Sequence, residues 1–196
     1  MNKAQSEGIG NLGKTDKLGQ TLLAGIHGIP EISRDEKRYF LGEFKERVLR
    51  KLSKKQVNET AIYPEVFGAL KDQRANKLIL NGEIDRSSME KYRVLARRLN
   101  KNCTVRIDPS FKGDTGLVVA SNQAIEESDI TVTDRSLRLQ KLGLSTSLIQ
   151  VAGKKVCRKC IKRIVEVDEN ELINYHQLTW IDRLGGERCP VHSKKV

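Results

Sequence analysis

The chain has 196 residues, 38% of them hydrophobic and 31% charged, so it can bury a sizeable core while keeping long stretches in water. It has no run of 18 apolar residues, and residues 1–13 lack the apolar region of a secretory signal, which argues against membrane-spanning and exported proteins. Four cysteines do not make a disulfide framework, so we expect a reducing, cytoplasmic location.

The net charge of +11 is unevenly distributed. Residues 133–196 hold 13 Lys/Arg against 7 Asp/Glu, whereas the longer stretch of residues 23–132 holds 20 against 16. The basic excess therefore lies mainly in the C-terminal third. Such a cluster is the electrostatic footprint of a protein that binds phosphate backbones, although the same charges can serve only as a solvated surface.

Residues 1–21 are predicted to be a flexible polar arm, and order is expected from residue 22. Residues 25–30 contain two glycines and a proline, which predicts a loop. Apolar residues then recur every four positions and predict a helix from about Arg34 to Leu52, packed on the core by its aromatic face. They are Phe40, Phe44, Val48 and Leu52.

The next hundred residues alternate between helix and strand. Pro64 is suited to the first turn of a short helix, and a second helix is expected from Asp85 or Ser87. Short strands are predicted at residues 77–80, 103–107, 117–120 and 130–132. Strands separated by helices indicate an α/β domain over residues 22–132, built as a compact sheet with helical cover.

One run of residues is specific enough to compare with a known family. It extends from Gly25 to Val48 and begins Gly-Ile-His-Gly-Ile-Pro-Glu-Ile-Ser-Arg-Asp-Glu. It resembles the signature of the YueI-like family of small uncharacterised proteins from Gram-positive bacteria, and the resemblance covers about residues 18–132. The resemblance implies a fold similar to the Bacillus chorismate mutase-like fold, a grouping that also holds ribosomal proteins and kink-turn RNA binders. It implies no activity and does not explain the C-terminal region.

That region contains two residue pairs with metal-ligand spacing, Cys157-Arg-Lys-Cys160 and Cys189-Pro-Val-His192. A two-residue spacer lets both ligands of a pair point inward from one tight turn, and thiolate and imidazole suit Zn²⁺. We therefore predict one structural zinc site in a module of residues 151–196, joined by a linker of residues 133–150. A disulfide and a chance spacing are the alternatives, and His176 is a rival for the fourth position.

The apolar residues between the two pairs predict a small core that needs the metal for its stability. They are Ile161, Ile164, Val165, Leu172, Ile173, Leu178, Trp180 and Leu184.

Six cations surround the first pair and predict a nucleic-acid-binding surface. They are Lys154, Lys155, Arg158, Lys159, Lys162 and Arg163. With only 5% aromatic residues, recognition of the backbone and shape of structured RNA, or of the ribosome, is favoured over base stacking. We therefore expect a non-catalytic RNA-binding protein.

The alternative is an enzyme or small-ligand binder with a site around His27, in which the zinc module makes protein contacts. The signatures of common cofactor and hydrolase sites are absent, and the sequence places no nucleophile or carboxylate beside His27.

Overall fold

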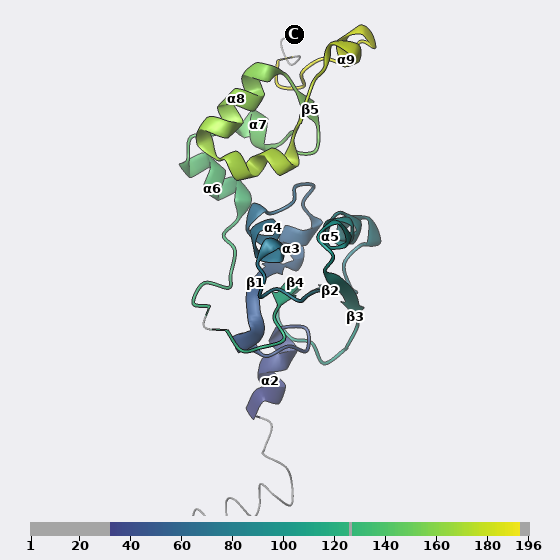
Figure 1. The fold of residues 1–196 in the computed structure, drawn as a ribbon, viewed down its shortest axis with the longest axis vertical. Coiled ribbons are helices and arrows are strands. Elements are labelled where there is room, and N and C mark those ends of the chain that lie inside the picture. Colours follow the sequence, from purple (N-terminus) through teal and green to yellow (C-terminus); the bar gives the residue numbers. More distant parts are fainter. Residues whose placement is uncertain (1–31, 126, 193–196) are drawn as a thin grey trace, which may run out of the picture. The chain divides into compact units, whose positions relative to one another are not determined.

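Four short strands form one mixed sheet in the computed structural model, which describes residues 32–125 and 127–192. Their spatial order is β1, β4, β2, β3; β4 is antiparallel to both of its neighbours, and β3 is parallel to β2 (Figure 1). The strands are β1 Val48–Ser53, β2 Lys77–Asn81, β3 Asn102–Arg106 and β4 Thr115–Ala120. The predicted arm, the loop at residues 25–30 and His27 lie outside the described residues.

Helices cover one face of this sheet, as the sequence predicts. Leu78 and Leu80 of β2 pack in the core on that face, whereas Ile79 belongs to the core on the other face. The covering helices contribute buried residues to the first core, and they are α3 Lys54–Asn58, α4 Pro64–Lys71 and α5 Arg86–Arg98.

Each covering helix begins at a residue that suits a helix N-terminus. Ser53 forms a capping box with Gln56 before α3, Pro64 occupies the first turn of α4, and the Asp85 side chain accepts the Ser87 N–H before α5. The predicted starts of α4 and α5 are therefore confirmed.

The predicted helix from Arg34 to Leu52 is wrong over its second half. Helix α2 spans Ile32–Tyr39, and the chain turns at Gly42, whose φ is +86° and whose N–H donates to the carbonyl of Lys37 at 2.8 Å. The 3₁₀ turn η1 at Lys45–Arg47 and strand β1 follow. Four is a multiple of the two-residue strand repeat, so the apolar spacing alone does not distinguish a helix from a strand.

The two phenylalanines predicted on the aromatic face of that helix lie in different environments. Phe40 is buried with Leu41 and Ile130 against the second face of the sheet, whereas Phe44 is only half-buried beneath the cations of Lys37 and Arg47. The strand predicted at residues 130–132 is reduced to a single parallel bridge between Thr131 and Lys51.

Residues 133–150, predicted as a linker, instead contain two helices that belong to a second hydrophobic core. Leu139, Leu144, Leu148 and Ile149 from this segment are all buried there. The elements of the C-terminal part are α6 Arg135–Lys141, α7 Thr146–Ile149, β5 Lys155–Val156, α8 Arg158–Val167, η2 Glu169–Asn174, β6 His176–Gln177 and α9 Trp180–Leu184. This core is consequently larger than the one predicted between the metal-ligand pairs.

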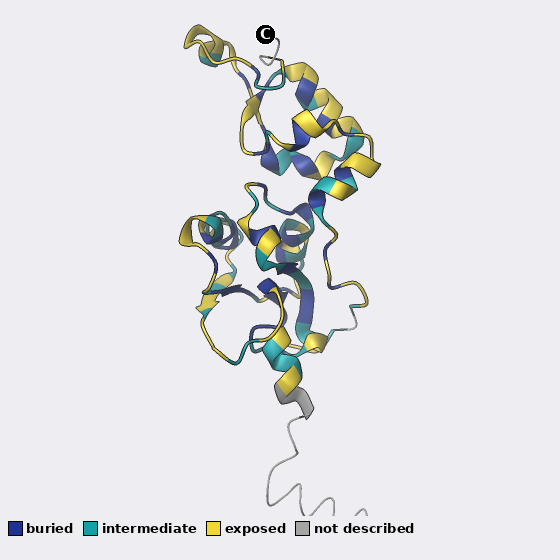
Figure 2. Cartoon of the chain, turned by 180° about the vertical axis from the view of Figure 1, so that it is seen from behind, coloured by how far each residue is buried: buried dark blue, intermediate teal, exposed yellow. Residues whose placement is uncertain are grey.

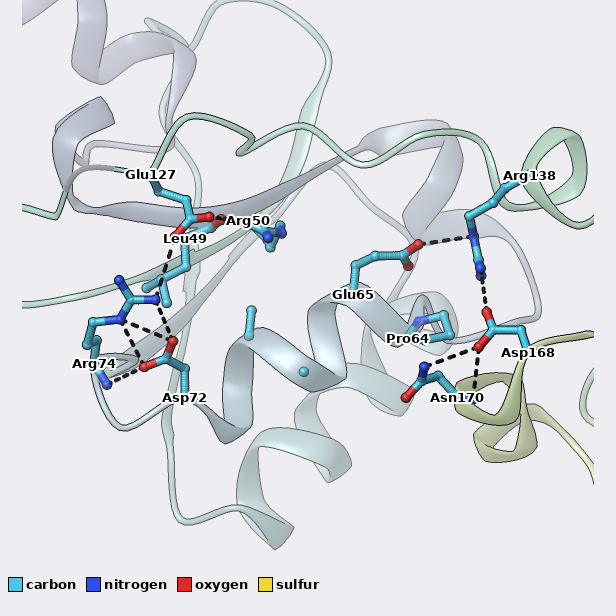
Figure 3. Close-up of a pocket in the computed structure, with 12 residues that line it drawn as sticks. Leu49, Arg50, Pro64, Glu65, Asp72, Arg74, Glu127, Arg138, Asp168 and Asn170 are labelled. Atoms are coloured by element: carbon cyan, nitrogen blue, oxygen red, sulfur yellow. Dashed lines mark hydrogen bonds and ion pairs between the residues drawn. The ribbon is translucent and has the colours of Figure 1, made fainter. Parts of the chain in front are cut away.

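A buried ion pair lies within the C-terminal part. Arg135 is 2% exposed and Glu171 is fully buried, and the Arg135 Nη2 lies 2.8 Å from the Glu171 Oε2. Arg138 also pairs with Glu171 and reaches Glu65 of α4 and Asp168, as Figure 3 shows for the latter two contacts. These pairs connect α6 and η2 with α4.

No helix among the described residues is long and apolar enough to cross a membrane.

Candidate metal centre

Two turns of the C-terminal part bring the four predicted ligands together. Cys157 is the N-cap of α8, and Cys160 lies in the first turn of the same helix. Cys189 and His192 flank a turn in which the His192 N–H donates to the Cys189 carbonyl at 3.0 Å. Because β5 leads directly into Cys157, its parallel pairing with β6 fixes where α8 begins.

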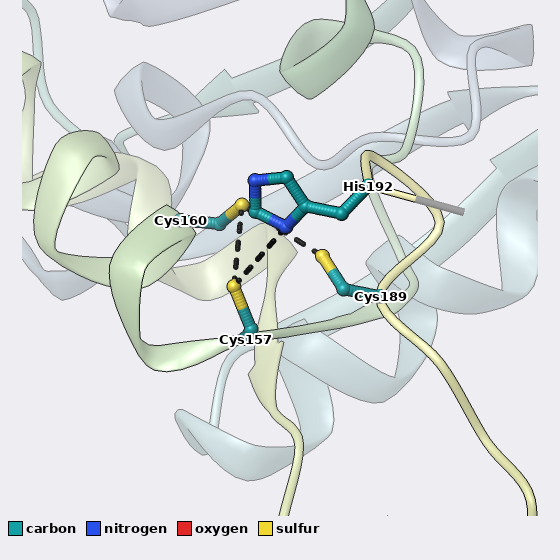
Figure 4. A group of neighbouring side chains, drawn as sticks. All are labelled: Cys157, Cys160, Cys189 and His192. Atoms are coloured by element: carbon teal, nitrogen blue, oxygen red, sulfur yellow. Dashed lines mark hydrogen bonds between the residues drawn. The ribbon is translucent and has the colours of Figure 1, made fainter. Parts of the chain in front are cut away.

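Three distances within the cluster fit one tetrahedral ion, and all four ligand atoms lie within 4.8 Å of one another. The Sγ of Cys160 lies 3.7 Å from the Sγ of both Cys157 and Cys189, and the Cys157 Sγ lies 3.5 Å from the His192 Nδ1 (Figure 4). Ligands bound to Zn²⁺ at about 2.3 Å for sulfur and about 2.0 Å for nitrogen lie about 3.8 Å apart for two sulfurs, and about 3.5 Å apart for sulfur and nitrogen. The cluster can therefore hold a metal ion with little rearrangement.

No disulfide joins the cysteines of the cluster in the structure. A disulfide bond is about 2.05 Å long, and all three cysteines of the cluster are free. His176 is not part of the cluster, because it lies in β6 and is exposed. The fourth residue of the cluster is thus His192.

The protein surroundings shift the pKa values of Cys160 and Cys189 in opposite directions. Burial, together with the neighbouring sulfurs, raises the pKa of Cys160 to about 12. Burial also opposes ionisation of Cys189, but backbone N–H groups of Cys157 and Val191 and the adjoining thiols outweigh it and lower the pKa of Cys189 to about 7. A bound dication would reverse the penalty on the buried thiolate, since metal binding deprotonates coordinating thiols.

One side of the cluster is covered and the other is open. Cys160 and Cys189 are buried in the second core, whereas His192 is exposed and Cys157 is half-buried. A hollow lies on the open side, and its lining consists of Cys157, Arg158, Lys159, Lys162, Arg183 and His192. The two exposed ligands therefore lie at the edge of a strongly basic depression.

The six cations predicted to bind nucleic acid do not all line this hollow. Arg158, Lys159 and Lys162 line the hollow and have no ion-pair partner within the described part of the chain. Lys155 instead pairs with Asp182 at 2.6 Å and Glu187 at 3.1 Å.

Arg163 pairs with Glu166 at 3.4 Å, and Lys154 is exposed outside the lining of the hollow. Three of the six predicted cations therefore line the hollow.

Arg183 is a lining residue that the sequence reasoning missed. It belongs to α9, which begins after a capping box formed by Thr179 and Asp182. That Thr-x-x-Asp pattern is the signal that marks the start of the helix. The apolar pattern places Trp180 and Leu184 in the predicted small core, and this prediction is wrong, because both side chains are exposed.

Comparison with known proteins assigns the family of the sheet domain. The family described as "Protein of unknown function (DUF1694)" matches residues 15–131, and the chain belongs to it. The uncharacterized protein YueI of Bacillus subtilis is 32% identical over 119 residues, which are 61% of this chain and 90% of YueI. The crystal structure of YueI from Bacillus subtilis matches with a TM-score of 0.51 and 31% identity, covering 61% of this chain and 93% of that chain.

These findings confirm the YueI-like resemblance. The family match ends at residue 131, whereas the cluster begins at Cys157. The candidate metal centre thus lies outside the matched segment.

Proposed function

We propose that this protein is a non-catalytic binder of structured RNA whose basic surface is held in place by a structural zinc ion. One observation carries the proposal: among the described residues, four cations and no carboxylate line the hollow beside the metal cluster. Phosphate groups are the ligands that such a lining attracts, and nucleic acids present them at regular spacing. Ribosomal RNA is one source of such a structure.

The donor set supports a structural zinc site. Three cysteines and one histidine fill the four positions of tetrahedral zinc, so no position is left for a substrate or an activated water. Three thiolates outweigh the two positive charges of Zn²⁺, and the neighbouring cations Arg158 and Lys159 would stabilise the resulting negative charge. Zinc would thereby fix the spacing of the cations on α8.

Two further expectations belong to the same proposal. The sheet domain is assigned to the Bacillus chorismate mutase-like grouping, in which RNA binders occur, and the protein is assigned to the cytoplasm. The absence of a membrane-spanning helix among the described residues is compatible with the second assignment.

The zinc site is tested by metal analysis of protein purified without chelator. We expect one zinc per chain, and cobalt substitution should give thiolate-to-metal charge-transfer absorption. Cys160→Ser should lose the metal, whereas the control Cys103→Ser should retain it, because Cys103 lies in β3 outside the cluster. Well under one metal ion per parent chain would count against the site.

The RNA-binding surface is tested by removing three lining cations together, Lys159→Ala, Lys162→Ala and Arg183→Ala. The matched control removes three exposed arginines of α5, at positions 86, 97 and 98. If the lining cations contact phosphates of duplex RNA, the slope of log affinity against log salt should fall by about 3 in the first variant and remain unchanged in the control.

Zinc content and thermal unfolding report whether the folded module is intact in each variant. Equal salt slopes for the first variant and the control would refute the proposed surface. The alternative function, an enzyme or small-ligand binder, would then be favoured.

A further inference from the structure

Helix α9 presents an aromatic ring to solvent beside the basic hollow. Trp180 is 71% exposed, and Ile181 and Leu184 are 62% and 77% exposed. Figure 2 shows this short helix largely in the colour of exposed residues. Burial of a tryptophan is a large source of stability, so a ring that the fold leaves in water is available to a ligand.

The helix that carries this ring is anchored to the metal module. The Thr179 hydroxyl and the Asp182 carboxylate close its first turn as a capping box. Asp182 also pairs with Lys155 of β5 at 2.6 Å, and Lys155 pairs in turn with Glu187, which follows α9. Lys155 thus connects the strand that leads into Cys157 with the helix that carries Trp180.

The ring and one of the lining cations share a helix face. Trp180 and Arg183 are three residues apart on α9, which makes them neighbours on its surface. Arg183 lines the hollow together with Arg158, Lys159 and Lys162. An aromatic surface therefore lies about one helical turn from a group of cations.

A ligand that uses both features needs a phosphate and a flat, accessible π surface. A duplex offers phosphates but keeps its base faces stacked inside, whereas an unpaired nucleotide offers both. Neighbouring cations also favour this ligand over an uncharged apolar segment of a protein, because they attract its phosphates.

We infer that Trp180 stacks on an unpaired base of RNA whose flanking phosphates lie in the basic hollow. The inference rests on the proposed function and deepens it, because it names an unpaired or bulged nucleotide of the structured RNA as the part recognised. It departs from the expectation, based on aromatic content, that recognition of the backbone and shape is favoured over base stacking.

The test compares a 12-nucleotide RNA without self-complementarity with the duplex that it forms with its complement. Trp180 is the only tryptophan, so its fluorescence reports on the stacked position alone. We expect the single strand to quench this emission and the duplex to leave it nearly unchanged. Stacking on aromatic side chains predicts that Trp180→Ala weakens single-strand binding by about 5-fold to 100-fold, measured by anisotropy of labelled RNA.

Two matched variants separate stacking from general effects. Trp180→Phe keeps an aromatic ring and should retain most of the affinity, whereas Leu184→Ala removes an equally exposed apolar side chain from the same helix and should change little. The salt slope should be the same in all three variants, since none of them removes a cation.

The outcomes distinguish this inference from the proposed function. Equal affinity for single strand and duplex, with unchanged emission and an unaffected Trp180→Ala, would overturn the inference and leave phosphate binding intact. Failure of the parent to bind either RNA would overturn both and leave the exposed face of α9 to a protein partner.

Discussion

Replacing Glu171 by alanine should be among the most damaging single changes in the C-terminal part. Its carboxylate accepts hydrogen bonds from the Arg135 Nε at 2.9 Å, the Arg138 Nη2 at 2.6 Å and the Asn174 Nδ2 at 3.1 Å. Without it, the Arg135 guanidinium keeps the Tyr175 hydroxyl and the Ile149 carbonyl as its partners among the described residues, while Arg135 remains 2% exposed. Breaking a buried pair in this way costs about 3–5 kcal/mol.

The assay is urea unfolding of zinc-loaded protein, followed by far-ultraviolet circular dichroism. For a urea dependence of about 2 kcal/mol/M, the expected loss lowers the midpoint by about 1.5–2.5 M. The control is Glu166→Ala, which removes an ion pair with Arg163 whose side chains are more than half exposed, and which should cost no more than about 1 kcal/mol. Glu171→Gln keeps the volume and one acceptor and should fall between the two.

If Glu171→Ala and Glu166→Ala shifted the midpoint equally, the argument from a buried counter-ion would be refuted.

On the second face of the sheet, where Phe40 is buried, Phe40→Ala should cost about 3 kcal/mol of stability. It should lower the melting temperature more than Phe44→Ala, because Phe44 is only half-buried. Equal melting shifts would contradict the assignment of Phe40 to this core. Burial lowers the pKa of Lys91 to about 8, whereas the unfolded chain keeps a value of about 10.4. Between these pKa values the unfolded state binds more protons than the folded state, so the free energy of unfolding should rise with pH. From about pH 8 to about pH 10 the parent should therefore become more stable relative to Lys91→Met, measured by unfolding experiments at each pH. A difference in unfolding free energy between the two proteins that does not change with pH would contradict the lowered pKa of Lys91.

Several elements could be predicted from the sequence, because the local preferences of their residues and the packing of the fold favour the same structure. Pro64 opens α4, and the apolar run at residues 77–80 becomes a central strand. The two ligand pairs predicted the cluster for a similar reason, since a two-residue spacer within one turn determines where the side chains point.

Other parts could not be predicted from neighbouring residues, because contacts with residues distant in the sequence determine their structure. Leu139 and Leu148 lie in helices of seven and four residues, which are too short to give a clear helical period, and only the second core shows why they are apolar. Apolar residues at the spacing of Trp180 and Leu184 indicate a common helix face, but not whether that face meets a core or solvent. The lining of the hollow likewise depends on how α8 and α9 come together.

The two ligand pairs also close a loop, since Cys160 and Cys189 are 29 positions apart along the chain. The entropic cost of closing a flexible loop grows only with the logarithm of its length, and each doubling adds about 0.6 kcal/mol. The segment that carries Trp180 and Arg183 can therefore lengthen or change its surface at small cost, while the four ligands continue to hold its ends. A metal ion bound at the cluster, as proposed above, would let the surface of this segment change while the fold of the C-terminal part is retained.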